Sequence, residues 1–431
     1  MKNRIQKKDL KELRSFLILW STQGLSQLGS SLTAFALTLW LYEKTGSALS
    51  TATLTICSYL PYVVMSIFAG ALTDRFDKKK TMLVCDLLAA ACTVGVFGLY
   101  MTDKLHIWHL YAINAISGLM NTVQQPASEV ATTLLIPKKH YQAASGLQSL
   151  SRSLISILHP VIATALYALA GLKSVIAVDL VSFAIAFLAL LIFIDIPKVK
   201  AGKNEAVLTL AKEGLLFLKK TPMILTMILF LSGINLVSSA VDAILPAFVI
   251  PNPKGGPTVL GIVTSFAGIA MIIGSLIVSV LPKPKNRIRV IYATMLFSMA
   301  TENFMLAFFR QPFMWCLGQV IGWVLVPVMS ANYDVVFRNT VPVELQGRVY
   351  ACRNSLQFFT IPIGLFMGGF LVDEVCEPFM EIQKNNDFFT FLFGQGKGSG
   401  AAVAMFIFGV IGSLFCLVVG MKLNQYSYSD D

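Results

Sequence analysis

Charged residues are scarce in this sequence. Only 13% of its 431 residues are Asp, Glu, Lys or Arg, whereas 55% are hydrophobic and the mean hydropathy is +0.70. A soluble protein carries about 25% charged residues, so a soluble chain of this length would lack the charge to cover its surface. The composition therefore excludes soluble, disordered and fibrous proteins, and it indicates a protein that crosses a membrane many times.

The sequence also lacks the patterns of metal, disulfide and nucleotide sites. Its seven cysteines form no Cys-x-x-Cys, and its four histidines have no carboxylate at metal-site spacing, so no metal or cofactor is expected. The segment GQGKGS (394–399) is not a phosphate loop, because Phe391 stands where such a loop needs a glycine. The net charge of +11 would suggest nucleic acid only in a soluble protein, so no nucleic-acid partner is expected.

Apolar stretches long enough to span a bilayer recur along the chain. A spanning helix needs about 20 mostly apolar residues. Polar residues interrupt two of the candidate ranges: Gln124 and Gln125 lie in the fourth, and Arg152 and His159 in the fifth. We expect an all-α membrane protein with twelve transmembrane helices. The twelve ranges are 16–40, 50–73, 81–102, 106–128, 143–170, 174–194, 222–250, 259–281, 289–309, 313–336, 347–372 and 401–421.

The positive charges favour one orientation in the membrane. Most of the 34 Lys and Arg residues fall on one side when residue 1 is placed inside, beginning with MKNRIQKKDLKELR (1–14). Because cytoplasmic loops are rich in Lys and Arg, we expect a multi-pass protein of the plasma membrane with both termini in the cytoplasm. No small-residue cleavage site follows residues 1–14, so we expect this arm to be retained.

A charged linker divides the chain into two six-helix halves. Residues 1–195 form the first half, residues 222–431 form the second, and residues 196–221 form the cytoplasmic linker. Within the linker, EAVLTLAKEGLLFLKK (205–220) has apolar residues at helical spacing with lysines between them. This pattern predicts an amphipathic helix on the inner membrane surface. Two related halves with one site between them is a recurring plan of transporters.

The most specific motif is GALTDRFDKKKTM (70–82), between the second and third spans. Gly70 allows helix backbones to approach closely, and Asp74 at a helix end can accept bonds from the N–H groups that open the eleventh helix. Arg75 needs an acidic partner, which we expect to be Glu129. The motif is either a breakable latch at the inner gate or a solvated charge run that fixes topology. The gate candidates are Gly70, Asp74, Arg75, Lys79 and Glu129.

This motif resembles the loop signature Gly-x-x-x-Asp-Arg-x-Gly-Arg-Lys of the major facilitator superfamily, with Asp77 in place of the second glycine. The segments LYEKTGSALS (41–50), DRFDKKKTMLVCDLLAA (74–90) and VPVELQGRVYACRNSLQ (341–357) look like the Mef-type macrolide exporters and their drug-efflux relatives in that superfamily. The resemblance covers nearly the whole chain. It implies a twelve-helix facilitator fold and proton-driven efflux of bulky amphiphilic molecules.

Ionisable residues inside the spans are candidates for proton or charge coupling. Such residues are costly in a membrane and usually face a cavity or a partner. A carboxyl group there can take up a proton on one side and release it on the other. We expect Asp86 to pair with basic groups of the inner gate and Arg152 to balance Asp179 or Asp242, while structural roles stay open for all. The candidates are Asp242, Glu302, Asp179, Arg152 and His159.

Uncharged polar and aromatic residues predict a pocket for an amphiphilic substrate. A roomy apolar cavity with few polar anchors suits broad specificity, although each residue alone is also explained by packing. In the eleventh span, Gly364-x-x-x-Gly368 predicts close helix contact. The pocket candidates are Gln23, Gln27, Asn114, Asn235, Trp323, Gln357 and Phe358.

Together these patterns predict a secondary active transporter that exports bulky, drug-like or macrolide-like amphiphiles by proton antiport and alternating access. Its expected partners are a small amphiphilic substrate, protons and the lipid bilayer, and it is expected to be a monomer. No enzymatic activity is expected, because the spans hold no paired nucleophile and base. The alternatives are a facilitator that moves a nutrient, lipid or siderophore, and a non-transporting membrane sensor. The sensor is disfavoured because no segment is long enough for a soluble signalling domain.

Overall fold

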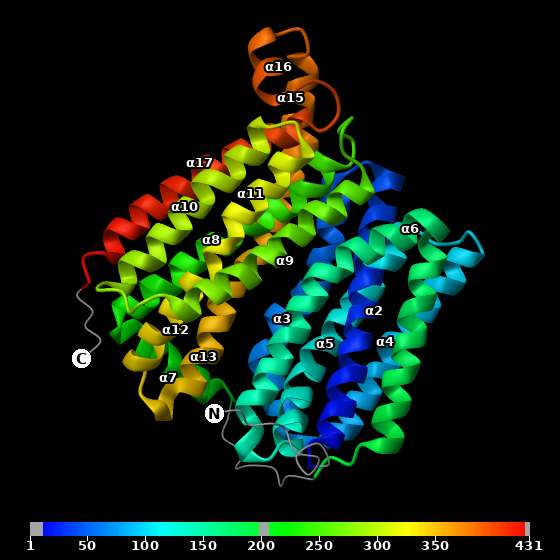
Figure 1. The fold of residues 1–431 in the computed structure, drawn as a ribbon, viewed down its shortest axis with the longest axis vertical. Helices are drawn as coiled ribbons and strands as arrows, with labels where there is room; N and C mark the ends of the chain where they lie inside the picture. The colour runs from blue at the N-terminus through cyan, green and yellow to red at the C-terminus, as the bar shows by residue number, and fades with distance from the viewer. Residues whose placement is uncertain (1–11, 198–206, 427–431) are drawn as a thin grey trace. The chain divides into compact units, whose positions relative to one another are not determined.

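The computed structural model describes residues 12–197 and 207–426, apart from some helical side chains that include those of residues 66–75 and 207–211. Across the described ranges the chain is helical and contains no β-strand (Figure 1). The N-terminal arm therefore lies almost entirely outside the described residues. The chain divides into two compact units, which consist of residues 1–37 with 57–204 and residues 38–56 with 205–431.

Unit 1 contains most of the first six predicted spans. Its helices are α2 (Arg14–Thr45), α3 (Ala48–Arg75), α4 (Lys78–Met101), α5 (Ile107–Leu135), the short η1 (Lys138–His140) and α6 (Tyr141–Phe193). The fifth and sixth predicted spans both lie in α6, which is broken at Gly171, where φ is 71°. Only glycine adopts this backbone conformation without strain, so Gly171 is the turn between two helices. The ends of α2 and α3 at residues 38–56 belong to unit 2.

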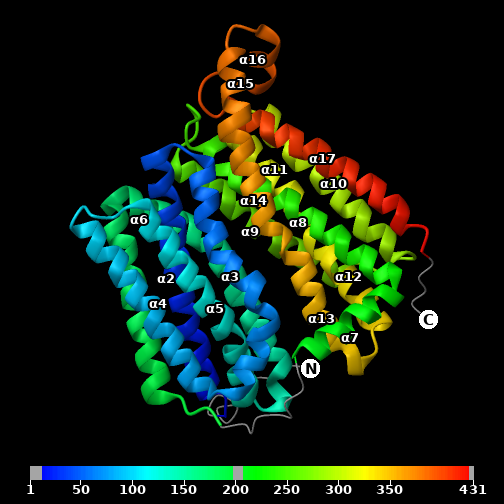
Figure 2. The ribbon, with the colours of Figure 1, turned by 180° about the vertical axis from the view of Figure 1, so that it is seen from behind.

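Unit 2 contains the linker helix and the remaining spans. Its helices are α7 (Val207–Lys220), α8 (Pro222–Val249), α9 (Pro257–Val280), α10 (Arg287–Phe308), α11 (Pro312–Val324), α12 (Val326–Thr340), α13 (Val343–Phe358), α14 (Thr360–Phe370), the π-helical η2 (Leu371–Cys376), α15 (Glu377–Ile382), α16 (Asp387–Phe393) and α17 (Ser399–Leu423). Helices α10 and α17 run side by side, and α14 packs against α8 (Figure 2).

Nine helical stretches among the described residues are long and apolar enough to span a membrane. Residues 16–40 and 106–128 fall in α2 and α5, which are long enough but are not among the nine. Two of the twelve predicted ranges, 143–170 and 174–194, share one of the nine stretches, which lies in α6. Both α2 and α5 carry rows of Gln, Asn and Ser that lower their apolar character. The count of twelve spans and the cytoplasmic location of the termini stay predictions.

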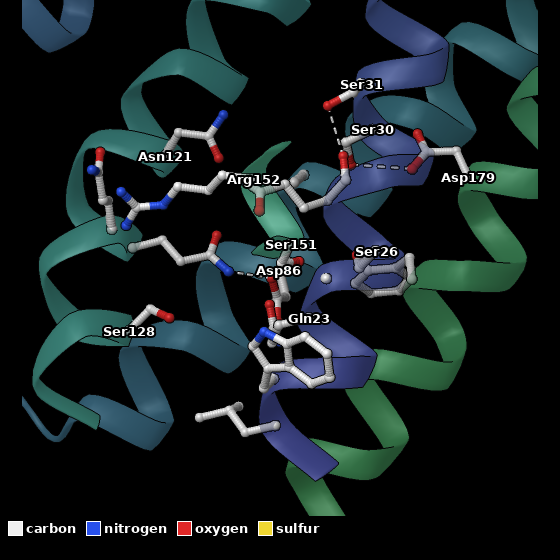
Figure 3. A pocket seen from close by; sticks show the side chains of 18 of the residues that line it. Gln23, Ser26, Ser30, Ser31, Asp86, Asn121, Ser128, Ser151, Arg152 and Asp179 are labelled. Atoms are coloured by element: carbon white, nitrogen blue, oxygen red, sulfur yellow. Dashed lines mark hydrogen bonds between the residues drawn. The ribbon is translucent and has the colours of Figure 1, made fainter. Parts of the chain in front are cut away.

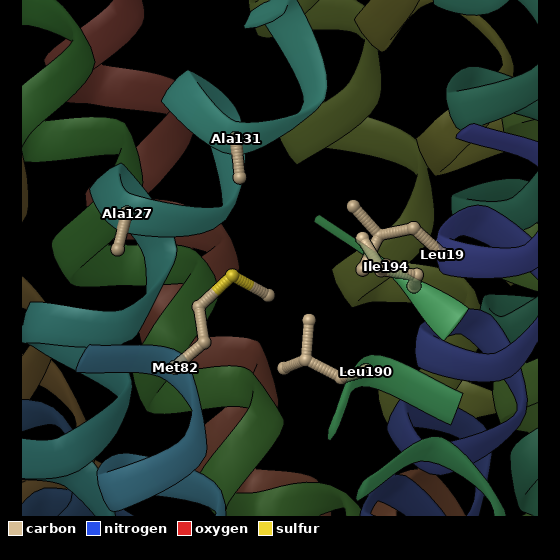
Figure 4. Packing of buried hydrophobic residues seen from close by; sticks show 6 residues of the cluster. All are labelled: Leu19, Met82, Ala127, Ala131, Leu190 and Ile194. Atoms are coloured by element: carbon tan, nitrogen blue, oxygen red, sulfur yellow. The ribbon is translucent and has the colours of Figure 1, made fainter. Parts of the chain in front are cut away.

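Apolar side chains hold α2, α4, α5 and α6 together in unit 1. Leu19, Met82, Ala127, Leu190 and Ile194 are each at most 2% exposed and pack around one point (Figure 4). Burial of each large apolar side chain contributes about 1.5–3 kcal/mol in water-facing proteins. In a membrane the gain comes mainly from close packing. This cluster fixes the ends of four helices that surround a polar cavity.

Glycines bring the helices of unit 2 close together. A Cβ atom on Gly364 would lie 2.1 Å from the carbonyl oxygen of Leu236, and one on Gly368 would lie 2.3 Å from that of Ala240. Any larger residue would therefore push α14 away from α8. The close contact predicted from Gly364-x-x-x-Gly368 is confirmed.

The linker contains the predicted amphipathic helix. Within the described residues it is α7, whose Glu213 carboxylate pairs with the Arg348 guanidinium of α13. Gly214 lies against the backbone of Arg348, while Leu215 and Leu216 are exposed on another face. The helix is therefore attached to α13 and keeps two leucine side chains partly exposed. Its place on a membrane surface stays a prediction.

Candidate substrate and proton sites

A polar cavity of about 560 Å³ lies in unit 1, lined by α2, α4, α5 and α6 (Figure 3). Its polar and charged lining residues are Gln23, Ser26, Gln27, Ser30, Ser31, Asp86, Thr93, Asn121, Gln124, Gln125, Ser128, Glu129, Thr132, Gln148, Ser151, Arg152 and Asp179. Drug-sized ligands occupy pockets of about 300–1,000 Å³. The cavity therefore has the size of a small-molecule site, but its lining is more polar than expected from the sequence.

Helical periodicity explains why so many polar side chains meet in this cavity. Residues three or four positions apart share a face of a helix. Gln23 and Gln27 on α2 have this spacing, as do Asn121, Gln124 and Ser128 on α5. The residues that weaken the fourth span as an apolar segment are thus the residues that line the cavity. The prediction that Gln23 and Gln27 line a cavity is consistent with this geometry.

Asp86 is one of two buried carboxylates that line the cavity. The Nε2 atom of Gln23 donates to it at 3.4 Å, and the Nε2 atom of Gln124 also donates to it. The observed partners of Asp86 are thus two amides from α2 and α5, and its expected pairing with basic groups of the inner gate is not seen among the described side chains. An amide carries both a donor and an acceptor, so it can bind either an ionised or a protonated carboxyl group.

Asp179 is buried between α6 and α2. It accepts a hydrogen bond from the Ser30 hydroxyl at 3.1 Å. A Cβ atom on Gly29 would lie 2.2 Å from the Ser182 hydroxyl and 3.0 Å from the Asp179 Cα, so the two helices touch here. Asp179 therefore links two helices at the edge of the cavity, which agrees with a structural role.

Arg152 is exposed to the cavity rather than paired with a carboxylate. Within unit 1 it makes no ion pair or hydrogen bond with the described residues, Asp179 included. The pairing of Arg152 with Asp179 is therefore not observed, and its balancing by Asp242 stays a prediction. The guanidinium instead adds a positive charge to a cavity whose described lining also holds Asp86, Glu129 and Asp179.

The inner-gate motif is only partly described. Gly70, Asp74 and Arg75 lie at the end of α3, but their side chains are outside the described residues, so their roles stay predictions. Glu129 is exposed, lines the cavity, and lies 3.5 Å from the Gln125 amide nitrogen. Its pairing with Arg75 remains a prediction.

Two other residues of the motif have clear structural roles. Asp77 replaces the usual glycine and accepts a hydrogen bond from the Lys80 backbone N–H at 3.0 Å, which caps α4. Lys79 donates to the Leu191 carbonyl at 3.1 Å and lies 3.6 Å from the Asp195 carboxylate. Because Leu191 is in the last turn of α6, a positive charge is stabilising there. Lys79 therefore ties α4 to the end of α6.

Unit 2 contains a second acidic site, whose residues the sequence did not predict to lie together. Glu302 on α10 is buried and accepts a hydrogen bond from the Trp323 indole nitrogen on α11 at 3.1 Å. A Cβ atom on Gly322 would lie 2.1 Å from the other carboxylate oxygen, so only glycine fits. Asp242 on α8 is exposed and acts electrostatically on Glu302. The predicted pocket residue Trp323 is thus a partner of Glu302.

The other predicted residues make contacts within their own unit. His159 Nδ1 lies 2.9 Å from the Ile155 carbonyl, and Asn114 donates to the Leu110 carbonyl at 2.9 Å, each within its own helix. Asn235 on α8 donates to the Gln357 carbonyl at 2.9 Å and joins α8 to α13. Gln357 and Phe358 both lie at the end of α13. These contacts are those of helix packing.

An arginine in unit 2 has a role that sequence reasoning missed. The Arg353 guanidinium lies 4.7–6.0 Å from the ring centres of Tyr333, Phe337 and Tyr350, and 3.8 Å from the Asp334 carboxylate. Aromatic faces attract a cation at these distances. The signal was present in the helical spacing, since Tyr350 precedes Arg353 by three residues. Arg353 joins α13 to α12.

Comparison with known proteins agrees with this architecture. The model of the Major Facilitator Superfamily matches residues 19–365. Macrolide efflux protein A of Streptococcus pyogenes is 26% identical over 367 residues, which cover 84% of this chain and 90% of that protein. Multidrug efflux pump Tap of Mycolicibacterium fortuitum is 25% identical over 359 residues, which cover 80% and 86%.

Solved structures show the same fold at low sequence identity. A variant of the nucleoside transporter NupG superposes with a TM-score of 0.72 at 14% identity and covers 94% of this chain and 98% of its own. A bacterial homologue of the iron transporter ferroportin, in its inward-facing state, also gives 0.72 at 14% identity, with coverage of 96% and 99%. Given the family match over most of its length, the chain belongs to the Major Facilitator Superfamily, a family of membrane transporters.

Proposed function

We propose that this transporter exports bulky amphiphilic compounds, drug-like or macrolide-like, by proton antiport and alternating access. The observation that carries the proposal is the polar cavity of unit 1, which combines a small-molecule volume with a buried carboxylate. The likeness to proteins named for macrolide and multidrug efflux supports the direction of transport.

The charge of the cavity favours a cationic amphiphile. Its described lining holds three carboxyl groups, on Asp86, Glu129 and Asp179, and one guanidinium, on Arg152. A basic amine on the substrate would be attracted to the excess of negative charge, while hydroxyl and carbonyl groups would bond to the Gln, Asn and Ser side chains. A lining with many neutral hydrogen-bonding side chains can bind substrates of different shapes, which suits a pump with broad specificity.

Asp86 is the residue that we assign to proton exchange in unit 1. The amides of Gln23 and Gln124 can bond to its charged or its protonated form by turning over. A proton taken up by Asp86 removes the charge that a cationic substrate would bind, so one carboxyl group can accept either a proton or the substrate. This competition couples the two fluxes. Asp242 and Glu302 of unit 2 are the further candidates for proton transfer.

Alternating access would follow from movement of residues 1–195 against residues 222–431, with 196–221 as the connection. In this scheme Asp74 bonds to the N-terminal end of the eleventh span, and Arg75 bonds to Glu129, when the inner side is closed. We propose twelve spans, cytoplasmic termini and a monomer in the plasma membrane, since the lysine-rich segments then lie inside.

The test is drug accumulation in cells that carry the wild-type protein, the Asp86→Asn variant or no transporter, each with and without a protonophore. Wild-type cells should accumulate several-fold less of a macrolide or a cationic dye, and the protonophore should remove the difference. Accumulation above that of empty cells would instead support a facilitator that imports a nutrient. Equal accumulation of macrolides and dyes in all cells would contradict the proposal.

A further inference from the structure

An acidic residue of unit 2 caps the beginning of α3. The Asp373 Oδ2 atom accepts hydrogen bonds from the Ser47 hydroxyl at 2.6 Å and from the Leu49 backbone N–H at 2.8 Å, while Oδ1 accepts one from the Ala48 N–H at 3.0 Å. The first N–H groups of a helix have no partner within the helix, and they form the positive end of its dipole. Asp373 satisfies these groups from a distant part of the sequence.

The segment that Asp373 holds is the junction between α2 and α3. Residues 38–56 belong to unit 2 by their contacts, whereas the rest of both helices belongs to unit 1. Ala52 is 2% exposed and packs with Ala243 and Leu365. A Cβ atom on Gly369 would lie 2.6 Å from the Leu49 Cα, so the backbones touch. The junction is therefore packed against α8 and α14 as well as capped.

A second acidic residue on the same helix provides an internal comparison. The Glu377 Oε1 atom accepts from the backbone N–H groups of Gly398 at 2.9 Å and Ala401 at 3.3 Å, at the start of α17. Residues four apart on a regular helix share a face. The π-helical η2 (Leu371–Cys376) contains Asp373, and such insertions often mark functional positions. Here Asp373 caps α3 and Glu377 caps α17. Of these two helices, only α3 continues into unit 1.

We infer that Asp373 is a releasable latch that holds the outer end of α3 against unit 2 while the transporter is closed to the outside. The inference rests on the proposed alternating access, because residues 38–56 belong in sequence to the first half and must leave unit 2 when the halves separate at that side. The hydrogen bonds to Asp373 can be exchanged for hydrogen bonds to water, so they can break and re-form in each transport cycle. Apolar packing of Ala52 and Leu49 alone would give no directional contact.

This latch mirrors the predicted inner gate on the same pair of helices. At the inner end, Asp74 lies on α3 and is predicted to cap the eleventh span. At the outer end the roles are exchanged, since Asp373 lies beyond α14 and caps α3. Each latch would stabilise one of the two states. Loss of the Asp373 cap should therefore favour the state that is open to the outside.

The test measures how readily the junction leaves unit 2, and it requires no transport. Ala52, which is 2% exposed, is replaced in the Ala52→Cys variant. Intact cells are treated with a membrane-impermeant maleimide, and the labelled position is located by peptide mass spectrometry. In the Asp373→Asn background the labelling rate at position 52 should rise about tenfold, since replacement of a helix cap shifts equilibria by about this factor. Ser47→Ala, which removes one bond, should give a smaller rise.

Glu374→Gln is the matched control. Glu374 is the next residue of the same π-helix, is exposed, and makes no hydrogen bond or ion pair within the part of the chain that is described. This substitution changes the same charge and should leave labelling at position 52 unaltered. An unchanged rate in both Asp373→Asn and Ser47→Ala, or an equal rise in Glu374→Gln, would overturn the latch. Drug efflux by the wild type is measured in parallel, and its absence would contradict the proposed function without changing the labelling result.

Discussion

Unit 1 and unit 2 treat buried acidic groups in opposite ways. In unit 1, Asp86 borders a cavity and accepts hydrogen bonds from the amides of Gln23 and Gln124. In unit 2, Glu302 is buried, with one indole donor and a glycine against it. The carboxylate of Asp86 thus borders space that a ligand could occupy, whereas that of Glu302 lies against the Trp323 indole and Gly322.

The largest expected effect is that of Asp86→Asn on efflux. The substitution keeps the shape of the side chain and removes its ability to exchange a proton, so efflux should fall by at least about tenfold at normal abundance in the membrane. The measurement is the initial rate of dye or macrolide efflux from preloaded cells. Asp103→Asn is the control, because Asp103 is exposed beyond the end of α4 and has a φ of 53°, which Asn tolerates. Wild-type efflux by Asp86→Asn would remove Asp86 from the mechanism.

A second prediction concerns the acids of unit 2. Asp242→Asn should reduce efflux several-fold, since it removes a group that can exchange a proton. It should not affect folding, because Asp242 is exposed and has no hydrogen bond or ion pair with described residues that the substitution would break. Glu302→Gln should reduce it less, because glutamine still accepts the Trp323 bond and preserves the packing. Both are compared with Asp86→Asn at equal abundance. A larger loss in Glu302→Gln than in Asp86→Asn would reverse the proposed division of roles between the units.

Glycine substitutions test the packing on which the unit 1 cavity depends. A Cβ atom on Gly118 of α5 would lie 2.1 Å from the Ser58 carbonyl of α3, so Gly118→Ala should lower the free energy of unfolding by about 1–3 kcal/mol. Gly95→Ala on α4 meets no atom within 4 Å and should be neutral or stabilising by about 0.5–1 kcal/mol. Thermal unfolding in detergent measures both, and equal midpoints for the two variants would show that the α3–α5 contact is not tight.

The smallest expected effect is that of Lys79→Gln. Loss of its contacts with the end of α6 should lower the thermal midpoint only slightly, because the Asp195 carboxylate is fully exposed and water screens the ion pair. Efflux should change by less than about twofold. An effect as large as that of Asp86→Asn would place Lys79 in the gate and not only in the fold.

The sequence was most informative where one physical requirement dominates. Apolar length predicted the nine described stretches that are long enough to span a membrane, and apolar residues at helical spacing with lysines between them predicted α7. Neither pattern depends on distant parts of the chain. The partners of Asp86 were not predictable, since Gln23 and Gln124 are brought to it by tertiary packing. Gln124 was noticed only as an interruption of an apolar range. In a membrane protein such an interruption is itself a signal of a cavity.

The site of unit 2 was missed for a similar reason. Glu302 and Trp323 were each singled out, but their 21-residue separation hides the hydrogen bond between them. The role of Asp373 was not predictable either, because its three bonds attach it to residues more than 300 positions earlier. Long-range contacts of this kind require the fold.

The central claim is that substrate and proton compete for Asp86. It is tested most directly by purified protein in liposomes with a pH-sensitive dye, in which addition of a cationic amphiphile should release protons from the wild type and none from Asp86→Asn. Proton release of equal size from both proteins would contradict the account.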